Sequence, residues 1–166
     1  MAQNRGKDFE DKIRDAFKAV PDTSVVRLPD PVMGYLGYRN ICDYIVYHYP
    51  YQYFIECKSV HGNTLSIHSN DPKKKYGLIT NNQWEGMLKE GCKKGVIAGV
   101  ICWWIDRDVT KFIPIQTLQM LRSNGYKSVK YNLNSVPTID IYGKKKRVFF
   151  DYDMEDFFAR SFPNDM

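Results

Sequence analysis

Two short runs rich in β-branched and aromatic residues, 41–47 and 51–57, flank a proline-containing break at 48–50. Runs of this composition on both sides of such a break are typical of a β-hairpin. If the turn is centred between the last two residues of the break, the antiparallel register places Asp43 directly opposite Glu56. Their Cβ atoms would then lie about 5 Å apart on one face.

Lys58 lies two residues after Glu56 and therefore belongs to the same face of the strand. Two carboxylates at this separation repel each other, and a hard divalent cation removes the conflict. Mg²⁺ favours one or two carboxylates together with waters and a substrate phosphate. Lys58 could then orient or deprotonate a metal-bound water, or stabilise phosphate charge. The alternative is a solvent-facing Asp and a Glu/Lys pair without chemistry.

The length of 166 residues suits one domain that is long enough to bury a proper core. A hydrophobic content of 43% and an aromatic content of 14% exclude a disordered chain. The formal net charge of +5 fits a polyanionic partner such as nucleic acid, although many basic proteins bind none.

The cysteines show no C-x-x-C spacing and no histidine at a zinc-binding spacing. They are Cys42, Cys57, Cys92 and Cys102. We expect reduced thiols in the core, where a free cysteine behaves as a small hydrophobe. The sequence has no N-terminal apolar segment of the signal-peptide kind and no long apolar span, so we expect neither secretion nor a membrane, and a cytoplasmic location by default.

Hydrophobic periodicity and breakers predict helices, strands and their order along the rest of the chain. The expected helices are 4–20, 80–94 and 114–123, and the expected strands are 24–28, 96–105 and 109–114, with a further extended segment after Lys58. The continuous apolar run 96–105 suits a strand buried on both faces, and the helix before it supplies the crossover that a parallel neighbour requires. The fold class is therefore α/β with a mixed sheet.

Two polar residues on the expected helices are candidates for the site. Glu10 flanks the apolar stripe of the first helix and could reach the hairpin carboxylates if that helix packs on the sheet. Gln83 lies in the first turn of the helix 80–94, where it could bind a phosphate or position the attacking water. The alternative for both is an ordinary solvated side chain.

Several basic residues are candidate contacts for a DNA backbone, although each could equally be a solvated charge. They are Arg5, Lys7, Arg27, Arg39, Lys73, Lys74 and Lys75. The later basic run 144–147 indicates either a solvated hairpin turn or one wall of a basic groove, next to short β runs around 138–142 and 147–151. Asp153 could cap a last helix that ends near residue 161.

The pattern Asp43-(x)12-Glu56-x-Lys58 resembles the catalytic motif of the PD-(D/E)xK nuclease superfamily. The proline that usually precedes the aspartate is absent, because Ile41 and Cys42 stand there. The resemblance implies a restriction-endonuclease-like core, in which a mixed central sheet is flanked by helices in the order αβββαβ.

The order and spacing of further stretches resemble the RecU-type Holliday-junction resolvases of Gram-positive bacteria and their phages. The shared stretches are Gly6-Lys-Asp-Phe-Glu10, Arg27-Leu-Pro-Asp-Pro31, Cys42-Asp43-Tyr44, Glu56-Cys57-Lys58, Asn63-Thr-Leu-Ser66 and Gln83. The resemblance implies one nuclease domain over 1–166, with a core at about 4–115 and a C-terminal extension at 116–166. It also implies a homodimer that makes paired nicks across a four-way DNA junction with Mg²⁺ or Mn²⁺.

The same resemblance assigns roles to the candidate residues. Asp43, Glu56 and the carbonyl of Cys57 would hold the metal, and Lys58 would handle the nucleophilic water. Glu10 would assist the metal and Gln83 would support phosphate or water positioning, which completes the catalytic set.

One departure from the family concerns the stalk, a long basic insertion that enters the junction ahead of the catalytic aspartate. Here only residues 32–42 separate Pro31 from Asp43. Two alternatives therefore stay open beside a junction resolvase. One is another nuclease of the superfamily, acting in repair, in restriction or as an exonuclease, and the other is a DNA-binding module without catalysis.

Overall fold

The computed structural model describes residues 4–30, 39–67 and 77–161. The helices are α1 (Arg5–Lys18), α2 (Asn81–Gly91), α3 (Ile115–Ser123) and α4 (Met154–Ser161), with a short 3-10 helix η1 (Ile105–Arg107). The strands are β1 (Thr23–Arg27), β2 (Tyr44–His48), β3 (Tyr51–Val60), β4 (Thr64–Ser66), β5 (Val96–Trp104), β6 (Val109–Pro114), β7 (Ser128–Lys130), β8 (Ile139–Asp140), β9 (Gly143–Lys145) and β10 (Phe150–Tyr152). The expected α/β class is confirmed.

The central sheet has six strands in the order β1-β2-β3-β5-β6-β8. β3 and β5 are parallel, whereas the other neighbouring pairs in this sheet are antiparallel. α2 lies between the two parallel strands in the sequence and provides the crossover that they require. The predicted mixed sheet and the predicted order αβββαβ at its heart are both observed.

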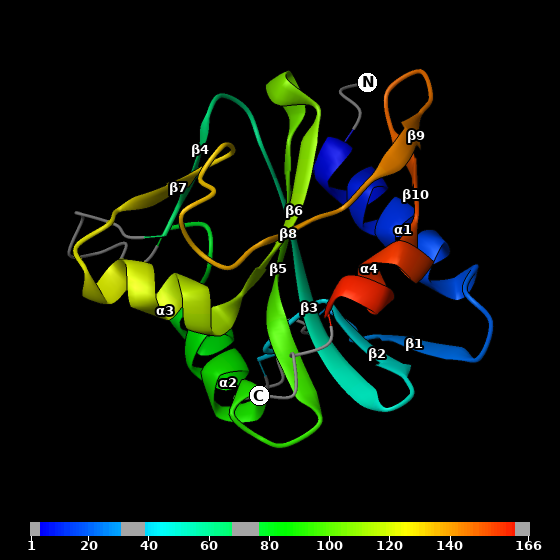
Figure 1. Ribbon diagram of the computed structural model, residues 1–166, viewed down its shortest axis with the longest axis horizontal. Helices are drawn as coiled ribbons and strands as arrows, with labels where there is room; N and C mark the ends of the chain where they lie inside the picture. Colours follow the sequence, from blue (N-terminus) through cyan, green and yellow to red (C-terminus); the bar gives the residue numbers. More distant parts are fainter. Residues whose placement is uncertain (1–3, 31–38, 68–76, 162–166) are drawn as a thin grey trace.

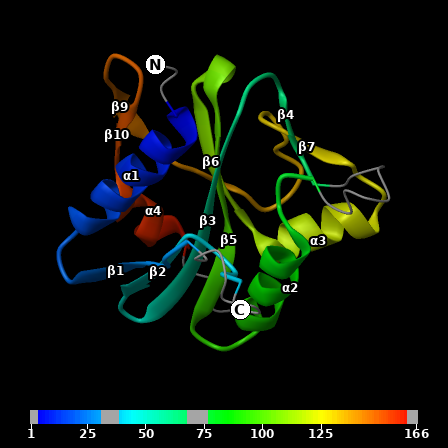
Figure 2. The same ribbon diagram turned by 180° about the vertical axis from the view of Figure 1, so that it is seen from behind.

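The helices form two layers, one on each face of the central sheet (Figures 1 and 2). α1 and α4 cover one face together with the β9–β10 hairpin, and α2 and α3 cover the other. The small β4–β7 sheet lies on the same side as α2 and α3. The hairpin β2–β3 is part of the central sheet, which lies between the two helical layers, so side chains from both layers can approach it.

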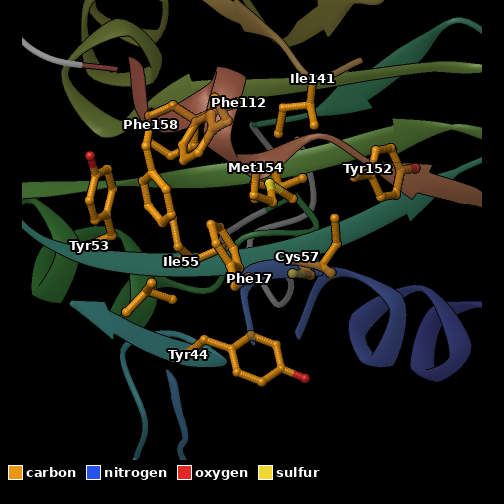
Figure 3. Packing of buried hydrophobic residues seen from close by; sticks show 14 of the residues in the cluster. Phe17, Tyr44, Tyr53, Ile55, Cys57, Phe112, Ile141, Tyr152, Met154 and Phe158 are labelled. Atoms are coloured by element: carbon orange, nitrogen blue, oxygen red, sulfur yellow. The ribbon is translucent and has the colours of Figure 1, made fainter. Parts of the chain in front are cut away.

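The core on the α1 and α4 face is rich in aromatic side chains (Figure 3). Phe17 of α1 packs against Phe158 of α4, with ring centroids 5.5 Å apart. The hydroxyl groups of Tyr53 and Ser161 are 2.8 Å apart and form a buried hydrogen bond between β3 and the last helix. The C-terminal helix is therefore packed into the same core as the first helix, because it buries its apolar stripe there.

The core on the opposite face joins α2 and α3 to the sheet. Trp84 and Met87 of α2 are buried in one cluster with Phe54 of β3 and Val100 of β5. Every residue of β5 from position 98 to position 104 is buried. The prediction of a strand covered on both faces is thus confirmed, and its continuous apolar run is explained by helices on both sides.

Local sequence explains where the helices begin and end. Thr80 caps α2 by accepting a hydrogen bond from the backbone N–H of Gln83, whose side chain in turn accepts from the backbone N–H of Thr80. Asp153 caps α4 as expected, because its side chain accepts from the backbone N–H of Asp156. α2 ends at Gly91, and Gly95, with a φ of +78° that glycine adopts without strain, belongs to the turn that leads into β5.

Three details differ from expectation. The strand β7 has no counterpart among the predicted elements. Lys144 and Lys145 lie on β9, paired with β10, rather than in the hairpin turn itself. All four cysteines are free, but Cys92 is exposed and is not a core thiol, because it caps the end of α2 and is followed by two lysines. Within the described ranges, no helix has the length and apolar character needed to span a bilayer.

Candidate active site

The β2–β3 hairpin has the register that the sequence predicted. Its turn consists of Tyr49 and Pro50, and Tyr44 pairs with Ile55 in the antiparallel ladder. Asp43 precedes Tyr44 by one residue and Glu56 follows Ile55 by one, so the two carboxylate residues occupy opposing positions. A one-residue slip would have sent them to opposite faces, and the buried apolar residues of both strands prevent it.

Glu56 is the centre of the candidate site and is only 2% exposed. The Nζ atom of Lys58 lies 2.6 Å from its Oε1 atom. The Nε2 atom of Gln83 donates a hydrogen bond to the same oxygen at 2.8 Å. The structure therefore brings together three of the predicted site residues, Glu56 and Lys58 from β3 and Gln83 from the first turn of α2.

Asp43 lies beside this group and is fixed by the backbone. Its Oδ2 atom accepts a hydrogen bond from the backbone N–H of Cys57 at 2.8 Å. The thiol of Cys57 is buried in the aromatic core on the α1 side of the sheet (Figure 3). Only the backbone of Cys57 can therefore serve the site, and its carbonyl as a metal ligand stays a prediction.

Burial perturbs the two hairpin carboxylates. It raises the pKa of Glu56 to about 7, with the charge of Asp43 as the next cause, while Lys58 and Gln83 act in the opposite direction. Burial also raises the pKa of Asp43, against the lowering effect of the Cys57 N–H and of Lys58. Buried carboxylates with raised pKa values are typical of functional sites, where a ligand supplies the missing stabilisation.

Glu10 reaches the same electrostatic environment from α1. Burial raises the pKa of Glu10 to about 7, and the charge of Asp43 is the second cause. The hydroxyl of Tyr44 donates to the backbone carbonyl of Glu10 at 3.3 Å, which ties α1 to the start of β2. The helix thus places its carboxylate near the hairpin site, as expected from its position beside the apolar stripe.

The residues present fit a divalent cation of the Mg²⁺ type. The Oε2 atom of Glu56 is buried and has no hydrogen-bond partner among the described residues. This oxygen faces Asp43, a second carboxylate whose pKa is raised. A hard cation stabilises the ionised form of such a carboxylate oxygen. No cage of three His, Cys, Asp or Glu side chains occurs in the described ranges.

The predicted DNA contacts have different surroundings. Arg27 forms an ion pair of 3.3 Å with Asp30, and its charge lowers the pKa values of both Glu10 and Asp43. Arg5 and Lys7 are exposed in the first turn of α1, and Arg39 is exposed too. Lys73, Lys74 and Lys75 lie outside the described residues. Contact of any of these residues with DNA stays a prediction.

Two relevant features escaped the sequence reasoning. The side chain of Gln83 has two tasks, because its Oε1 completes the cap of α2 while its Nε2 binds Glu56. Lys111 is 5% exposed on β6 and pairs with Asp140 at 2.7 Å. A Thr-x-x-Gln capping box could have indicated the first feature. No pattern in the sequence marks the second, since it depends on strands distant in the chain.

Comparisons with known proteins add a likeness of fold. No protein-family model and no curated protein matches the sequence. Among solved structures, the chain is similar to Hjc, a Holliday junction resolvase from the archaeal hyperthermophile Archaeoglobus fulgidus. The TM-score is 0.48 and the identity is 17%, over 75% of this chain and 88% of the other.

Proposed function

We propose that this protein is a metal-dependent DNA endonuclease that resolves four-way junctions by paired nicks. The observation that carries the proposal is the convergence of Asp43, Glu56 and Lys58 at one end of a hairpin. The buried Glu56 contacts Lys58 at 2.6 Å and keeps one carboxylate oxygen without a hydrogen-bond partner in the described structure. A charged group so placed needs a ligand, and a hard cation bound to a phosphodiester meets that need.

Asp43, Glu56 and the carbonyl of Cys57 would hold Mg²⁺ or Mn²⁺, with Glu10 assisting through water. The ion would supply Lewis-acid activation of a phosphoryl oxygen and of water. The ionised form of each carboxylate is needed for this binding. Since Glu10 and Glu56 have pKa values of about 7, ion and proton compete near neutral pH.

Lys58 and Gln83 have supporting roles in the proposed reaction. The ammonium of Lys58 can donate to the attacking water or to a non-bridging oxygen of the phosphate, where negative charge develops. Gln83 fixes the carboxylate plane of Glu56 through its 2.8 Å hydrogen bond. In the reaction, the water oxygen bonds to phosphorus as one P–O ester bond breaks. One water proton is released to solvent, and the departing oxygen takes up a proton to leave as a hydroxyl group.

The choice of branched DNA and of a homodimer depends on the resemblance to the RecU-type resolvases, in the order and spacing of the shared stretches. The formal charge of +5 supports a polyanionic substrate. Paired nicks require two sites related by symmetry, which a homodimer provides. With only residues 32–42 in place of a long stalk, the junction must be recognised by other surfaces.

A substrate panel tests the proposal most directly. A four-way junction, a linear duplex and a flap of matched sequence would be incubated with Mg²⁺, with Mn²⁺ and with EDTA. We expect symmetric paired nicks in the junction with either ion, and no product with EDTA. Equal cutting of the linear duplex would remove the junction claim and leave another nuclease of the superfamily. Binding without cleavage under all conditions would favour the non-catalytic module.

A further inference from the structure

A surface pocket of about 210 Å³ lies where α1 meets the β9–β10 hairpin. It is lined by Lys12 of α1 and by the hairpin residues Lys146, Arg147, Val148, Phe149, Phe150 and Asp151. Three cationic side chains and one carboxylate thus surround an aromatic and aliphatic floor. Cationic side chains around aromatic rings are typical of surfaces that bind the backbone and bases of nucleic acids.

The charge of this region is only partly neutralised. Residues 144–147 are four consecutive cations, and two of them form ion pairs, Lys145 with Asp108 and Lys146 with Asp151, the latter at 3.3 Å. Within the described part of the chain, Lys12 and Arg147 have no ion-pair partner. Both side chains belong to exposed positions. The pocket therefore presents two uncompensated cations to solvent, which is an arrangement that favours a polyanion.

The hairpin is held firmly at its base. The hydroxyl groups of Thr110 and Tyr152 are 2.9 Å apart in a buried hydrogen bond between β6 and β10. Phe149 packs against Trp103 of β5 with ring centroids 5.5 Å apart. The ion pair of Lys145 with Asp108 adds a contact to the turn between β5 and β6. These three contacts fix the hairpin on the sheet and hold its cationic side chains near the pocket. Less conformational entropy of the hairpin is therefore lost when a ligand binds.

We propose that this pocket is a second nucleic-acid site, which binds the phosphodiester backbone of a nucleotide other than the cleaved one. Lys12 and Arg147 would contact phosphate oxygens, because both are free cations at the rim. Phe149 and Phe150 would contact the sugar or an unstacked base. Asp151 disfavours an anion, but its pairing with Lys146 reduces that effect.

The position of the pocket indicates a separate part of the substrate. Glu10 and Lys12 are two residues apart on α1, so their side chains leave the helix about 200° apart. The pocket and the hairpin carboxylates therefore lie on two sides of a helix that is about 10 Å thick. One phosphate cannot contact both places. A DNA molecule seated at the carboxylates would reach the pocket with another arm or a flanking segment.

This inference rests on the proposed function for its choice of DNA as the polyanion, so its test measures binding apart from cleavage. The double variant K12Q/R147Q removes both free cations. As a matched control, K89Q/K94Q removes two exposed lysines, one in the last turn of α2 and one in the turn after it. Binding of a labelled four-way junction would be measured by anisotropy in EDTA at several salt concentrations. Thermal unfolding of each variant checks that the fold is intact.

We expect K12Q/R147Q to weaken junction binding about tenfold near 0.1 M salt and to reduce the slope of log affinity against log salt by about two. The control variant should keep the wild-type affinity within about twofold, because it has the same change in net charge away from the pocket. Affinity losses of the same size in both double variants would overturn the proposal, since charge alone would then explain them.

Unchanged affinity in K12Q/R147Q would also overturn the proposal and would favour an acidic protein partner for the same surface. The outcome for the catalytic site is independent. In one outcome, the wild type and the control bind DNA equally and K12Q/R147Q binds weakly, but none of the three proteins cleaves DNA with Mg²⁺ or Mn²⁺. The proposal of a second nucleic-acid site is then supported and the nuclease proposal fails. If K12Q/R147Q binds as the wild type does while the wild type cleaves, the nuclease stands and the pocket fails.

Discussion

Lys58 and Glu56 form an ion pair 2.6 Å long on one face of β3. The ammonium of Lys58 contacts Oε1 of the Glu56 carboxylate, and Gln83 donates a hydrogen bond to the same atom at 2.8 Å. Oε2 has no hydrogen-bond partner in the described ranges, although it is buried. Both donors therefore orient the carboxylate and leave its second oxygen available to a ligand.

Asp43→Asn should abolish cleavage and keep DNA binding. The amide retains the shape of the side chain but removes one negative charge from the cation site, and we expect a loss of about 100-fold or more in the cleavage rate. Junction affinity measured in EDTA should stay within about threefold of the wild type. Asp15→Asn, on the exposed side of α1, is the matched control and should cleave normally. Full activity in Asp43→Asn would remove this residue from the site.

The metal-free protein should lose stability as the pH rises from 5 to 8. The folded protein keeps a proton on Glu56 up to a pKa of about 7, whereas the unfolded chain releases it near 4.5. Between these values the folded state binds more protons, so rising pH favours unfolding. We expect a drop in the free energy of unfolding on the order of 2 kcal/mol, measured by urea denaturation in EDTA. Glu56→Gln should show a clearly flatter pH dependence, and an equal slope would contradict the raised pKa.

Mg²⁺ or Mn²⁺ should stabilise the folded protein more at pH 8 than at pH 6. The ion binds the ionised carboxylates, and protons compete for Glu10 and Glu56 below their pKa values of about 7. Thermal unfolding at several ion concentrations measures this difference through the shift in Tm. Glu56→Gln should lose most of the shift. A shift of the same size in that variant, or in the wild type at both pH values, would place the ion elsewhere.

Gln83→Glu separates the two tasks of Gln83. A glutamate can still accept from the backbone N–H of Thr80 and so keep the cap of α2. It removes the donor to Glu56 and places a second carboxylate against it, which raises the pKa of Glu56 further. We expect a stability change below about 1 kcal/mol, a loss of cleavage at pH 7 of about tenfold, and partial recovery at higher pH. Gln83→Ala should instead lose about 1 kcal/mol of stability as well.

The ion pair between the buried Lys111 and the partly exposed Asp140 should respond asymmetrically to mutation. Asp140→Asn leaves the ammonium of Lys111, which is 5% exposed, without its charge partner, and should cost about 2 kcal/mol of stability. Lys111→Met removes the buried charge and should cost less, because Asp140 can turn to solvent. Urea denaturation of the two variants at pH 7 gives the comparison. Equal losses would mean that desolvation of the lysine has little effect.

The sequence predicted the hairpin and its register, because alternating buried residues and a two-residue turn leave only one pairing with both faces satisfied. It likewise predicted the buried strand β5, since its continuous apolar run is a local feature of the sequence. Glu10 and Gln83 were named as candidates from their places on helices. Their side chains reach the carboxylates only because α1 and α2 pack on opposite faces of the sheet, and local sequence patterns do not encode this packing.

Short-range sterics and periodic burial therefore fix the order of the elements in the central sheet, its mixed pairing and the opposition of Asp43 and Glu56, so these features can be predicted from the chain. Tertiary structure alone decided that Glu56 receives two donors on one oxygen and none on the other within the described chain. It also decided the burial of Lys111 and the approach of the β9–β10 hairpin to α1. The physical reason is that desolvation and charge coupling depend on distances between segments far apart in the sequence.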